Sequence, residues 1–116
     1  MDIKTVKERW WWGWSEHLIA TGGTMEIQYD DDFPGWGWLC GLVVVKEERK
    51  KGIGRALMEK AEEQVRESGK TAMRLGVEKD RLWMIEWYKR LGFIVLDMDS
   101  ERLVYMEKRL DYGKEQ

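Results

Sequence analysis

Alternating apolar and polar positions predict strands in the first part of the chain. Large aromatic residues alternate in the tryptophan-rich segment 8–16, which predicts a first strand with one aromatic face. Apolar and β-branched residues predict a second strand over 18–29, where the pair Gly22-Gly23 indicates a bulge. After a loop rich in Asp, Pro and Gly, residues 36–45 are predicted to form a third strand that is buried towards its end.

A helical period replaces this alternation after residue 46. Within 55–68, charged residues occupy one stripe and apolar residues the other, which predicts an amphipathic helix buried through Leu57, Met58, Ala61 and Val65. Gly69 follows where a C-terminal cap belongs, and 71–77 is predicted to be a short strand. The strand, helix, strand unit over 36–77 predicts that its two strands pair in parallel through a right-handed crossover.

A second helix and two strands are predicted to close the chain. The helix covers 81–91, with Asp80 as its N-cap, Gly92 at its end and an apolar stripe of Met84, Trp87, Tyr88 and Leu91. Residues 93–97 and 102–110 are predicted strands around a turn at 99–101, and 111–116 a frayed tail. We therefore expect one α/β domain over 1–116, with about six strands and two main helices.

Composition and charge disfavour several classes of function. The 20 Lys and Arg residues are balanced by 22 Asp and Glu residues, so a net charge of -2 gives no electrostatic basis for binding nucleic acid. The longest apolar run, 39–45, is too short to span a membrane, and the N-terminus has no secretory pattern. The sequence has one cysteine, Cys40, and one histidine. It can therefore form no internal disulfide and offers too few ligands for a zinc site. We expect a cytoplasmic protein that binds no metal, membrane or nucleic acid.

The segment from Arg49 to Arg55 carries the clearest chemical signal. Its glycines precede a helix, where backbone N–H groups and the helix dipole favour a bound anion, so it is a candidate phosphate cradle. A P-loop would need Gly-Lys-Ser/Thr, but Gly54 is followed by Arg55 and Ala56, and a dinucleotide fingerprint would need a small residue in place of Leu57. A glycine-rich helix start with solvated charges remains the alternative.

Several segments in order resemble the GCN5-related N-acetyltransferase (GNAT) family. Arg49, Gly52 and Gly54 match its acetyl-CoA motif, and the strand Leu42-Val43-Val44-Val45 precedes that motif. Downstream, Tyr88-Lys89-Arg90-Leu91-Gly92-Phe93 looks like the closing "YxxxGF" segment, and residues 106–110 look like the usual last strand. The resemblance covers about residues 10 to 110.

The resemblance implies a fold, a reaction and a cofactor site. The fold is a mixed, mostly antiparallel sheet whose central parallel strand pair separates at one end to admit acetyl-CoA. The reaction moves the acetyl group to a primary amine, on a small molecule or a protein lysine, by direct attack in a ternary complex. Backbone amides of Lys51, Gly52, Ile53, Gly54 and Arg55 would bind the pyrophosphate, with added charge from Lys50, and Leu42, Val43 and Val44 would pair with pantetheine and supply the oxyanion donor. Tyr88 would be the acid that protonates the leaving thiolate.

The general base stays open, because Trp38 and Cys40 stand where the family often has a glutamate. Other residues that could act as the base are Glu26, Glu78, Asp31, Asp32 and His17. Cys40 is itself an alternative nucleophile, although a lone cysteine is more often a small buried hydrophobe. The family's usual N-terminal helices also have no counterpart before Trp10, and Arg81 and Met84 replace the family's common Asn and Ala. A CoA-binding or scaffolding module without turnover is therefore the alternative function.

Two surface features bear on the acceptor. Five tryptophans are candidates for an aromatic wall that holds a cationic amine, or alternatively fill core volume or cover a homodimer interface: Trp10, Trp12, Trp14, Trp36 and Trp38. The acidic run Asp30-Asp31-Asp32 would attract a cationic acceptor if its loop faces the active site, or it is a solvated turn.

Overall fold

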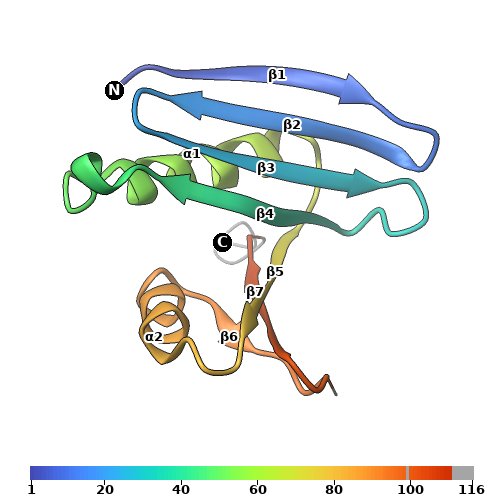
Figure 1. The fold of residues 1–116 in the computed structure, drawn as a ribbon. Coiled ribbons are helices and arrows are strands. Elements are labelled where there is room, and N and C mark those ends of the chain that lie inside the picture. Colours follow the sequence, from blue (N-terminus) through green and yellow to red (C-terminus); the bar gives the residue numbers. More distant parts are fainter. Residues whose placement is uncertain (99, 111–116) are drawn as a thin grey trace, which may run out of the picture.

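A computed structural model describes residues 1–98 and 100–110, in which one seven-stranded sheet carries two α-helices (Figure 1). The strand order across the sheet is β1-β2-β3-β4-β5-β7-β6. The strands are β1 (Ile3–Arg9), β2 (Gly13–Ala20), β3 (Gly23–Asp30), β4 (Trp36–Val44), β5 (Ala72–Glu78), β6 (Ile94–Val95) and β7 (Leu103–Arg109). The helices are α1 (Ile53–Glu67) and α2 (Leu82–Arg90), and a short 3-10 helix, η1 (Lys46–Glu48), precedes α1. The mixed, mostly antiparallel sheet with two main helices is the expected fold; the predicted tail at 111–116 lies outside the described residues.

The first predicted strand is wrong, because residues 8–16 straddle a hairpin. β1 and β2 are antiparallel, and the loop between them closes with an N–H···O bond from Trp10 to Gly13 of 2.7 Å. Gly13 packs directly on β3, where a Cβ atom would lie 1.9 Å from the carbonyl oxygen of Tyr29. The tryptophan alternation therefore marks the end of one strand and the start of the next, and adds a strand to the sheet.

The predicted strand 18–29 is also two strands, because Gly22 forms a turn and not a bulge. Its φ of 86° lies in the left-handed region that glycine adopts without strain, and it lets Ala20 pair with Gly23 across the β2–β3 hairpin. The described residues therefore hold seven strands where the pattern predicts about six. At the other end of the chain, β6 is limited to Ile94–Val95, shorter than the predicted 93–97.

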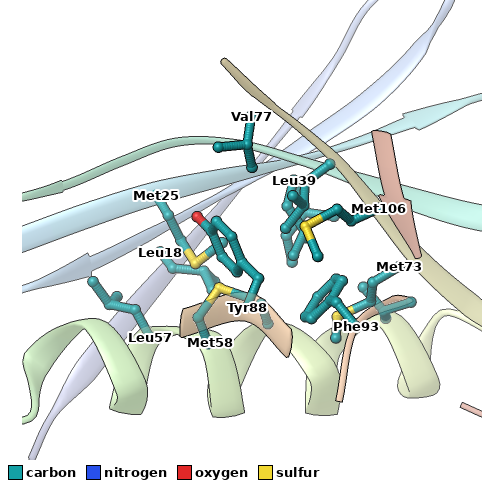
Figure 2. Close-up of a cluster of buried hydrophobic side chains, with 14 of the residues drawn as sticks. Leu18, Met25, Leu39, Leu57, Met58, Met73, Val77, Tyr88, Phe93 and Met106 are labelled. Carbon is teal, nitrogen blue, oxygen red and sulfur yellow. The ribbon is translucent and has the colours of Figure 1, made fainter. Parts of the chain in front are cut away.

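Both helices pack on one face of the sheet. The predicted stripe of α1 is confirmed, since Leu57, Met58, Ala61 and Val65 are all buried. Helix α2 buries Ile85 and Tyr88, while the other members of its predicted stripe are only partly covered. Its N-cap is Arg81, and no side chain caps it, so the prediction of Asp80 is wrong. Figure 2 shows Tyr88 extending from α2 into a cluster with residues of α1 and the sheet.

The opposite face of the sheet carries polar and aromatic side chains. Strand alternation places Leu18, Met25, Leu39 and Leu75 under the helices. Their neighbours along the strands, His17, Glu26, Trp38 and Arg74, therefore point to the other side, and each is only partly covered. In residues 1–98 and 100–110 both α-helices lie on the first face, which leaves this second face open.

The predicted parallel pair is confirmed, and it is short. β4 and β5 are in register only at Trp36↔Ala72, Gly37↔Met73 and Trp38↔Arg74. Beyond Trp38, β4 runs on beside β3 alone, while β5 continues beside β7. The two central strands therefore separate towards their C-terminal ends, which creates a gap in the sheet.

A β-bulge bends β4 at this separation. Cys40 pairs with Glu26 and Val43 with Thr24, so two residues, Gly41 and Leu42, lie opposite the single residue between them on β3. Gly41 has a φ of 66°, a value that favours glycine.

Candidate active site

A cavity of about 210 Å³ occupies the gap between β4 and β5. We call it the slot. Side chains from both strands and both helices surround it, and most are apolar: Met25, Leu39, Cys40, Gly41, Leu42, Met58, Leu75, Gly76, Met84 and Tyr88. A slot of this kind suits a narrow, flexible chain that enters between the strands, because apolar walls cover its sides while strand edges offer hydrogen bonds.

The free edge of β4 supplies those hydrogen bonds. The Val45 N–H donates to the Gly22 carbonyl at 2.8 Å, so it points towards β3. Backbone groups alternate sides along a strand, and the polar groups of Val44 and Leu42 therefore point to the slot side while those of Val43 point to β3. Of the three predicted pantetheine partners, Leu42 lines the slot. Val44 lies further along the same strand, where its carbonyl accepts a hydrogen bond from the Arg49 Nε.

The predicted phosphate cradle forms the connection from β4 to α1. Gly52, at φ 83°, is the N-cap of α1, and the first intrahelical bond runs from the Ala56 N–H to the Gly52 carbonyl at 2.9 Å. The amides of Ile53, Gly54 and Arg55 precede that bond, so they have no carbonyl partner within the helix. Together with the helix dipole, these free amides are the kind of donors that favour an anion at a helix start.

Packing fixes this end of α1 against the sheet. Ile53 is buried and covers Gly23, where a Cβ atom would lie 2.8 Å from the Ile53 Cγ2. Gly54 lies against Val44 and the Trp87 ring of α2, whose atoms are 3.8 and 3.7 Å from the position of a Cβ. The cradle, the end of β4 and α2 therefore meet at Gly54.

The charged side chains of this segment have local partners. The Arg49 Nε donates to the Val44 carbonyl at 3.1 Å, and Lys51 pairs with Glu48 at 3.1 Å. Arg55 pairs with Glu59 at 3.5 Å, and Lys50 is exposed at a φ of 69°. Because surface pairs are weak, these side chains add charge near the cradle while its backbone amides supply the directed donors.

Tyr88 lines the slot from the α2 side. Only 6% of the residue is exposed, and its ring packs on those of Trp87 and Phe93, with centroid distances of 5.0 and 5.6 Å. Burial raises the pKa of the Tyr88 hydroxyl above its ordinary value. The phenol is therefore protonated at neutral pH, as a proton donor must be.

Cys40 also lines the slot, and its surroundings disfavour the thiolate. Burial, with a smaller contribution from the negative charge of Glu26, raises the pKa of the Cys40 thiol to about 11. A nucleophilic cysteine needs a lowered pKa or an adjacent base that takes its proton. The environment of Cys40 is that of a small apolar residue.

Two of the candidate bases, Glu26 and His17, lie together, and the others lie elsewhere in the structure. Glu26 is the register partner of Cys40, and His17 is the register partner of Glu26 on the far side, so these two lie side by side on the open face, with Glu26 next to Cys40. Asp31 instead forms an ion pair with Arg9 at 2.7 Å, and the Asp32 N–H donates to the Asp30 side chain at 2.8 Å within the loop. Glu78 ends β5 opposite Leu103.

The predicted tryptophan wall is divided between the two faces. Trp14 lies on the helix-covered face, where it stacks on Tyr29 with a centroid distance of 4.1 Å. The Trp10 Nε1 donates to the Ser15 hydroxyl at 2.8 Å. The other three tryptophans line a groove of about 610 Å³ on the open face. The residues that line this groove are Trp12, Gln28, Asp30, Phe33, Trp36, Trp38, Arg74, Leu96, Met98 and Tyr105. Sequence analysis missed Phe33 and Tyr105, because they come from a loop and from the last long strand.

Two further properties concern the described part of the chain. Neither α-helix there is long and apolar enough to cross a membrane. No three His, Cys, Asp or Glu side chains come together there in a group that would hold a metal ion.

Residues 4–93 match the model of the acetyltransferase (GNAT) family, and the chain belongs to this family of acetyltransferases. The family model thus spans the bulged β4, the cradle and α2. No curated protein is similar enough in sequence to match.

Solved acetyltransferases share the fold. Nourseothricin acetyltransferase is 23% identical, with a TM-score of 0.69 over 85% of this chain and 66% of that one. The PaiA N-acetyltransferase of Thermoplasma acidophilum, solved in complex with coenzyme A, is 26% identical, with a TM-score of 0.68 over 82% of this chain and 59% of that one. A GNAT acetyltransferase of Elizabethkingia anophelis with acetyl-CoA bound is 13% identical, with a TM-score of 0.70 over 85% of this chain and 77% of that one. The chain thus spans less than two thirds of the length of the first two.

Proposed function

We propose that this protein is an acetyl-CoA-dependent N-acetyltransferase that moves the acetyl group to a primary amine. The observation that carries the proposal is the continuity of three features. The slot between β4 and β5, the open backbone edge of β4 and the amide-rich start of α1 adjoin one another in the order that a thioester, a pantetheine arm and a pyrophosphate would need. The coenzyme A complex of the similar Thermoplasma enzyme supports the choice of cofactor.

In the proposed complex the chain binds acetyl-CoA mainly through its backbone. The amides from Lys51 to Arg55 would hold the pyrophosphate, and the β4 edge at Leu42 and Val44 would pair with the pantetheine amides. The β4 backbone at the bulge would then direct an N–H to the thioester carbonyl oxygen. That donor would stabilise the oxyanion as the tetrahedral intermediate forms.

The chemical step is a direct transfer in a ternary complex. The neutral amine attacks the thioester carbonyl, the C–N bond forms, and the C–S bond breaks as the intermediate collapses. Tyr88 would donate its phenolic proton to the departing sulfur, and the new amide nitrogen loses its remaining extra proton to a base. The high pKa of the Cys40 thiol supports direct transfer and disfavours an acetylated cysteine.

The acceptor is a primary amine, carried by a small molecule or by a protein lysine. The acidic loop lies at the end of β3 beside the aromatic groove, which Asp30 lines, so its negative charge would attract a cationic acceptor towards the open face. We further propose that residues 1–116 act as one domain in the cytoplasm. A homodimer that covers part of the open face is compatible with this function.

Thiol release from acetyl-CoA tests the proposal. The wild-type chain is mixed with acetyl-CoA and a panel of amines, lysine peptides and aminoglycosides, and free thiol is measured against amine-free controls. Amine-dependent release with a matching acetylated product supports an acetyltransferase. Saturable acetyl-CoA binding without release for any member of the panel favours the alternative, a CoA-binding module without turnover.

A further inference from the structure

A second cavity, of about 350 Å³, lies on the open face of the sheet next to the slot. We call it the open-face cavity. Met25 and Gly41 line both cavities, so the two adjoin at the β4 bulge, where the thioester would lie in the proposed function. A group held in the open-face cavity would therefore approach the thioester from the side opposite the helices.

The chemistry of the open-face cavity suits an aliphatic ammonium ion. Val6 and Ile19 give it apolar walls, and both are exposed hydrophobic residues of the kind that a ligand covers. Glu26 and His17 give it one polar end, where the His17 Nδ1 lies 3.9 Å from Glu26 Oε1. An anionic group and a proton-accepting group thus lie together in the open-face cavity, and Glu26 is the register partner of Cys40, which lines the slot.

Further contacts hold this pair in place. The Gln28 Nε2 donates to Glu26 Oε2 at 2.8 Å, which leaves the other carboxylate oxygen directed to the His17 side. On the opposite edge of the ring, His17 Nε2 lies 3.3 Å from Glu8 Oε1 and 3.5 Å from the Ser15 hydroxyl. The tautomer that is protonated at Nε2 donates to Glu8 and leaves Nδ1, on the Glu26 side, as the acceptor.

We propose that the open-face cavity binds the acceptor amine, with Glu26 pairing with its ammonium group and His17 removing its proton. The inference rests on the proposed acetyl transfer, and it names the ligand class as a primary amine on an unbranched alkyl chain, as in a lysine side chain. A base is needed because an alkylammonium has a reference pKa of about 10.4 and no lone pair until it loses a proton. An imidazole accepts a proton near neutral pH more readily than a carboxylate does.

The protons balance over one turnover. His17 Nδ1 takes one proton from R–NH3⁺ and becomes an imidazolium between the two carboxylates. The resulting R–NH2 forms the C–N bond, Tyr88 gives its proton to the sulfur as the C–S bond breaks, and the excess proton on the new amide nitrogen restores the phenol through solvent. The imidazolium then releases its proton to water, since His17 is partly exposed.

The charges around His17 determine how pH acts on this step. Glu8 and Lys4 of β1 lie on the open face beside Val6, the register partner of His17, while Glu26 faces it from β3 with Cys40 of β4 beyond. The rate should rise with pH because the amine must lose a proton before it attacks, and that rise should depend on His17.

Nuclear magnetic resonance tests binding without any need for turnover. His17 is the only histidine, so a chain labelled at histidine Cε1 gives one resonance. We expect n-butylamine at millimolar concentration to shift this resonance saturably in the wild-type chain, and not in Glu26→Gln, while n-butanol leaves it unchanged. An unchanged resonance with n-butylamine in the wild-type chain, or an equal shift in Glu26→Gln, would overturn the proposed site, whatever the acetyl-CoA assay shows.

Kinetics with acetyl-CoA and Nα-acetyl-lysine methylamide then test the role of His17. His17→Gln should lower kcat by about 100-fold and abolish the pH dependence, while Glu26→Gln should raise the amine KM by about 10-fold. Glu63→Gln, on the exposed side of α1, is the matched control and should change neither. A His17→Gln enzyme with the wild-type pH profile would exclude the base. Amine binding seen by resonance without thiol release in any variant would reject acetyl transfer while supporting the amine site.

Discussion

Trp38 and Arg74 are the last residues at which β4 and β5 face each other in register. The Arg74 guanidinium is held there by Glu107 at 2.8 Å and lies over the Trp36 ring, 4.0 Å from its centroid. Charge pairing and cation-π contact thus stabilise the closed end of the gap, and the slot opens immediately beyond it. The position of the slot follows from where this parallel pairing stops.

If the start of α1 binds phosphate, alanine substitution should have different effects at two glycines of similar conformation. Gly52 and Gly69 have φ values of 83° and 80°, and a Cβ atom would meet nothing within 4 Å at either. Alanine at each should therefore cost a similar 1–2 kcal/mol of stability. Only Gly52→Ala should also weaken coenzyme A binding, by about tenfold, because it shifts the amides that bind phosphate.

Equilibrium dialysis against coenzyme A and thermal unfolding check this pair. Gly69→Ala is the matched control, since it lies at the far end of α1. Equal affinities for the two variants would show that the cradle does not bind the cofactor.

Removal of the Tyr88 hydroxyl should slow transfer without unfolding the protein. Tyr88→Phe keeps the ring and its packing, so coenzyme A affinity and melting temperature should stay near wild type while kcat falls by about 100-fold. Burial raises the pKa of this phenol above 10.0, so the wild-type rate should show no loss of the acid up to about pH 9. Stopped-flow thiol release across pH measures both effects, and a Tyr88→Phe rate equal to wild type would remove Tyr88 from the mechanism.

The Cys40 thiol should be slow to react. A pKa of about 11 against an ordinary value of 9.0 gives roughly 100-fold less thiolate at pH 8, so alkylation by iodoacetamide should be slower than for free cysteine by about that factor. Cys40→Ala should retain acetyl transfer. Mass spectrometry of the chain after incubation with acetyl-CoA provides the opposing test, because an acetylated Cys40 would contradict direct transfer.

A buried polar network links α1 to the sheet and should be sensitive to single changes. Glu16 is fully buried and accepts hydrogen bonds from Gln64 of α1 and, at 3.3 Å, from the Tyr29 hydroxyl. Gln64→Leu leaves a buried carboxylate short of a donor and should cost about 1–3 kcal/mol in urea unfolding. Adding Glu16→Leu should cost less than the two single changes together, since both partners are then apolar. Strict additivity would show that the pair does not interact.

An ion pair between α1 and β7 should make the free energy of unfolding depend on pH in the acid range. Glu62 is paired with Lys108 at 2.6 Å and with Arg66 at 3.4 Å. Burial opposes ionisation of Glu62, but the two cations outweigh it and lower the pKa of the carboxyl below 4.5. The stabilisation is therefore complete above the unfolded pKa and is lost as pH falls through the lower folded pKa.

Glu62→Gln should accordingly lower stability by about 1 kcal/mol or less at pH 7. The difference from wild type should shrink as the pH falls through the lowered pKa of Glu62, because the wild-type carboxyl then becomes protonated and uncharged. Urea unfolding at several pH values measures this. Glu86→Gln, which removes an exposed i,i+3 pair on α2, is the control, and a Glu62→Gln deficit that does not shrink at all as the pH falls would exclude the electrostatic origin.

Much of the fold was predictable because local periodicity and burial agree. The α1 stripe, the strand from Trp36 and the crossover to Ala72 each place apolar residues on the side that packs. The N-terminal hairpins were missed because tryptophan alternation continues through a tight turn, and because Gly22 serves a turn as readily as a bulge. Whether a glycine bends or reverses a strand depends on pairing with distant segments, which no short window contains.

The candidate site, like the fold, could be predicted only in part from the sequence. The cradle and Tyr88 lie within the contiguous motifs that carry the resemblance to the GNAT family, so the sequence alone could point to them. The side-by-side placement of Glu26 and His17 depends on the register of β2 with β3, and the division of the tryptophans depends on which face each strand presents. These are tertiary relationships, and several acidic residues were equal candidates until the strands were placed.

Amide chemical shifts give the most direct test of the central claim, that acetyl-CoA binds along β4 and at the start of α1. Titration of the ¹⁵N-labelled chain with acetyl-CoA should shift the amides of Gly52, Ile53, Gly54 and Arg55 together with those of Leu42 and Val44, all with one saturation curve. Absence of any saturable shift, or shifts confined to the aromatic groove around Trp36 and Tyr105, would contradict the account.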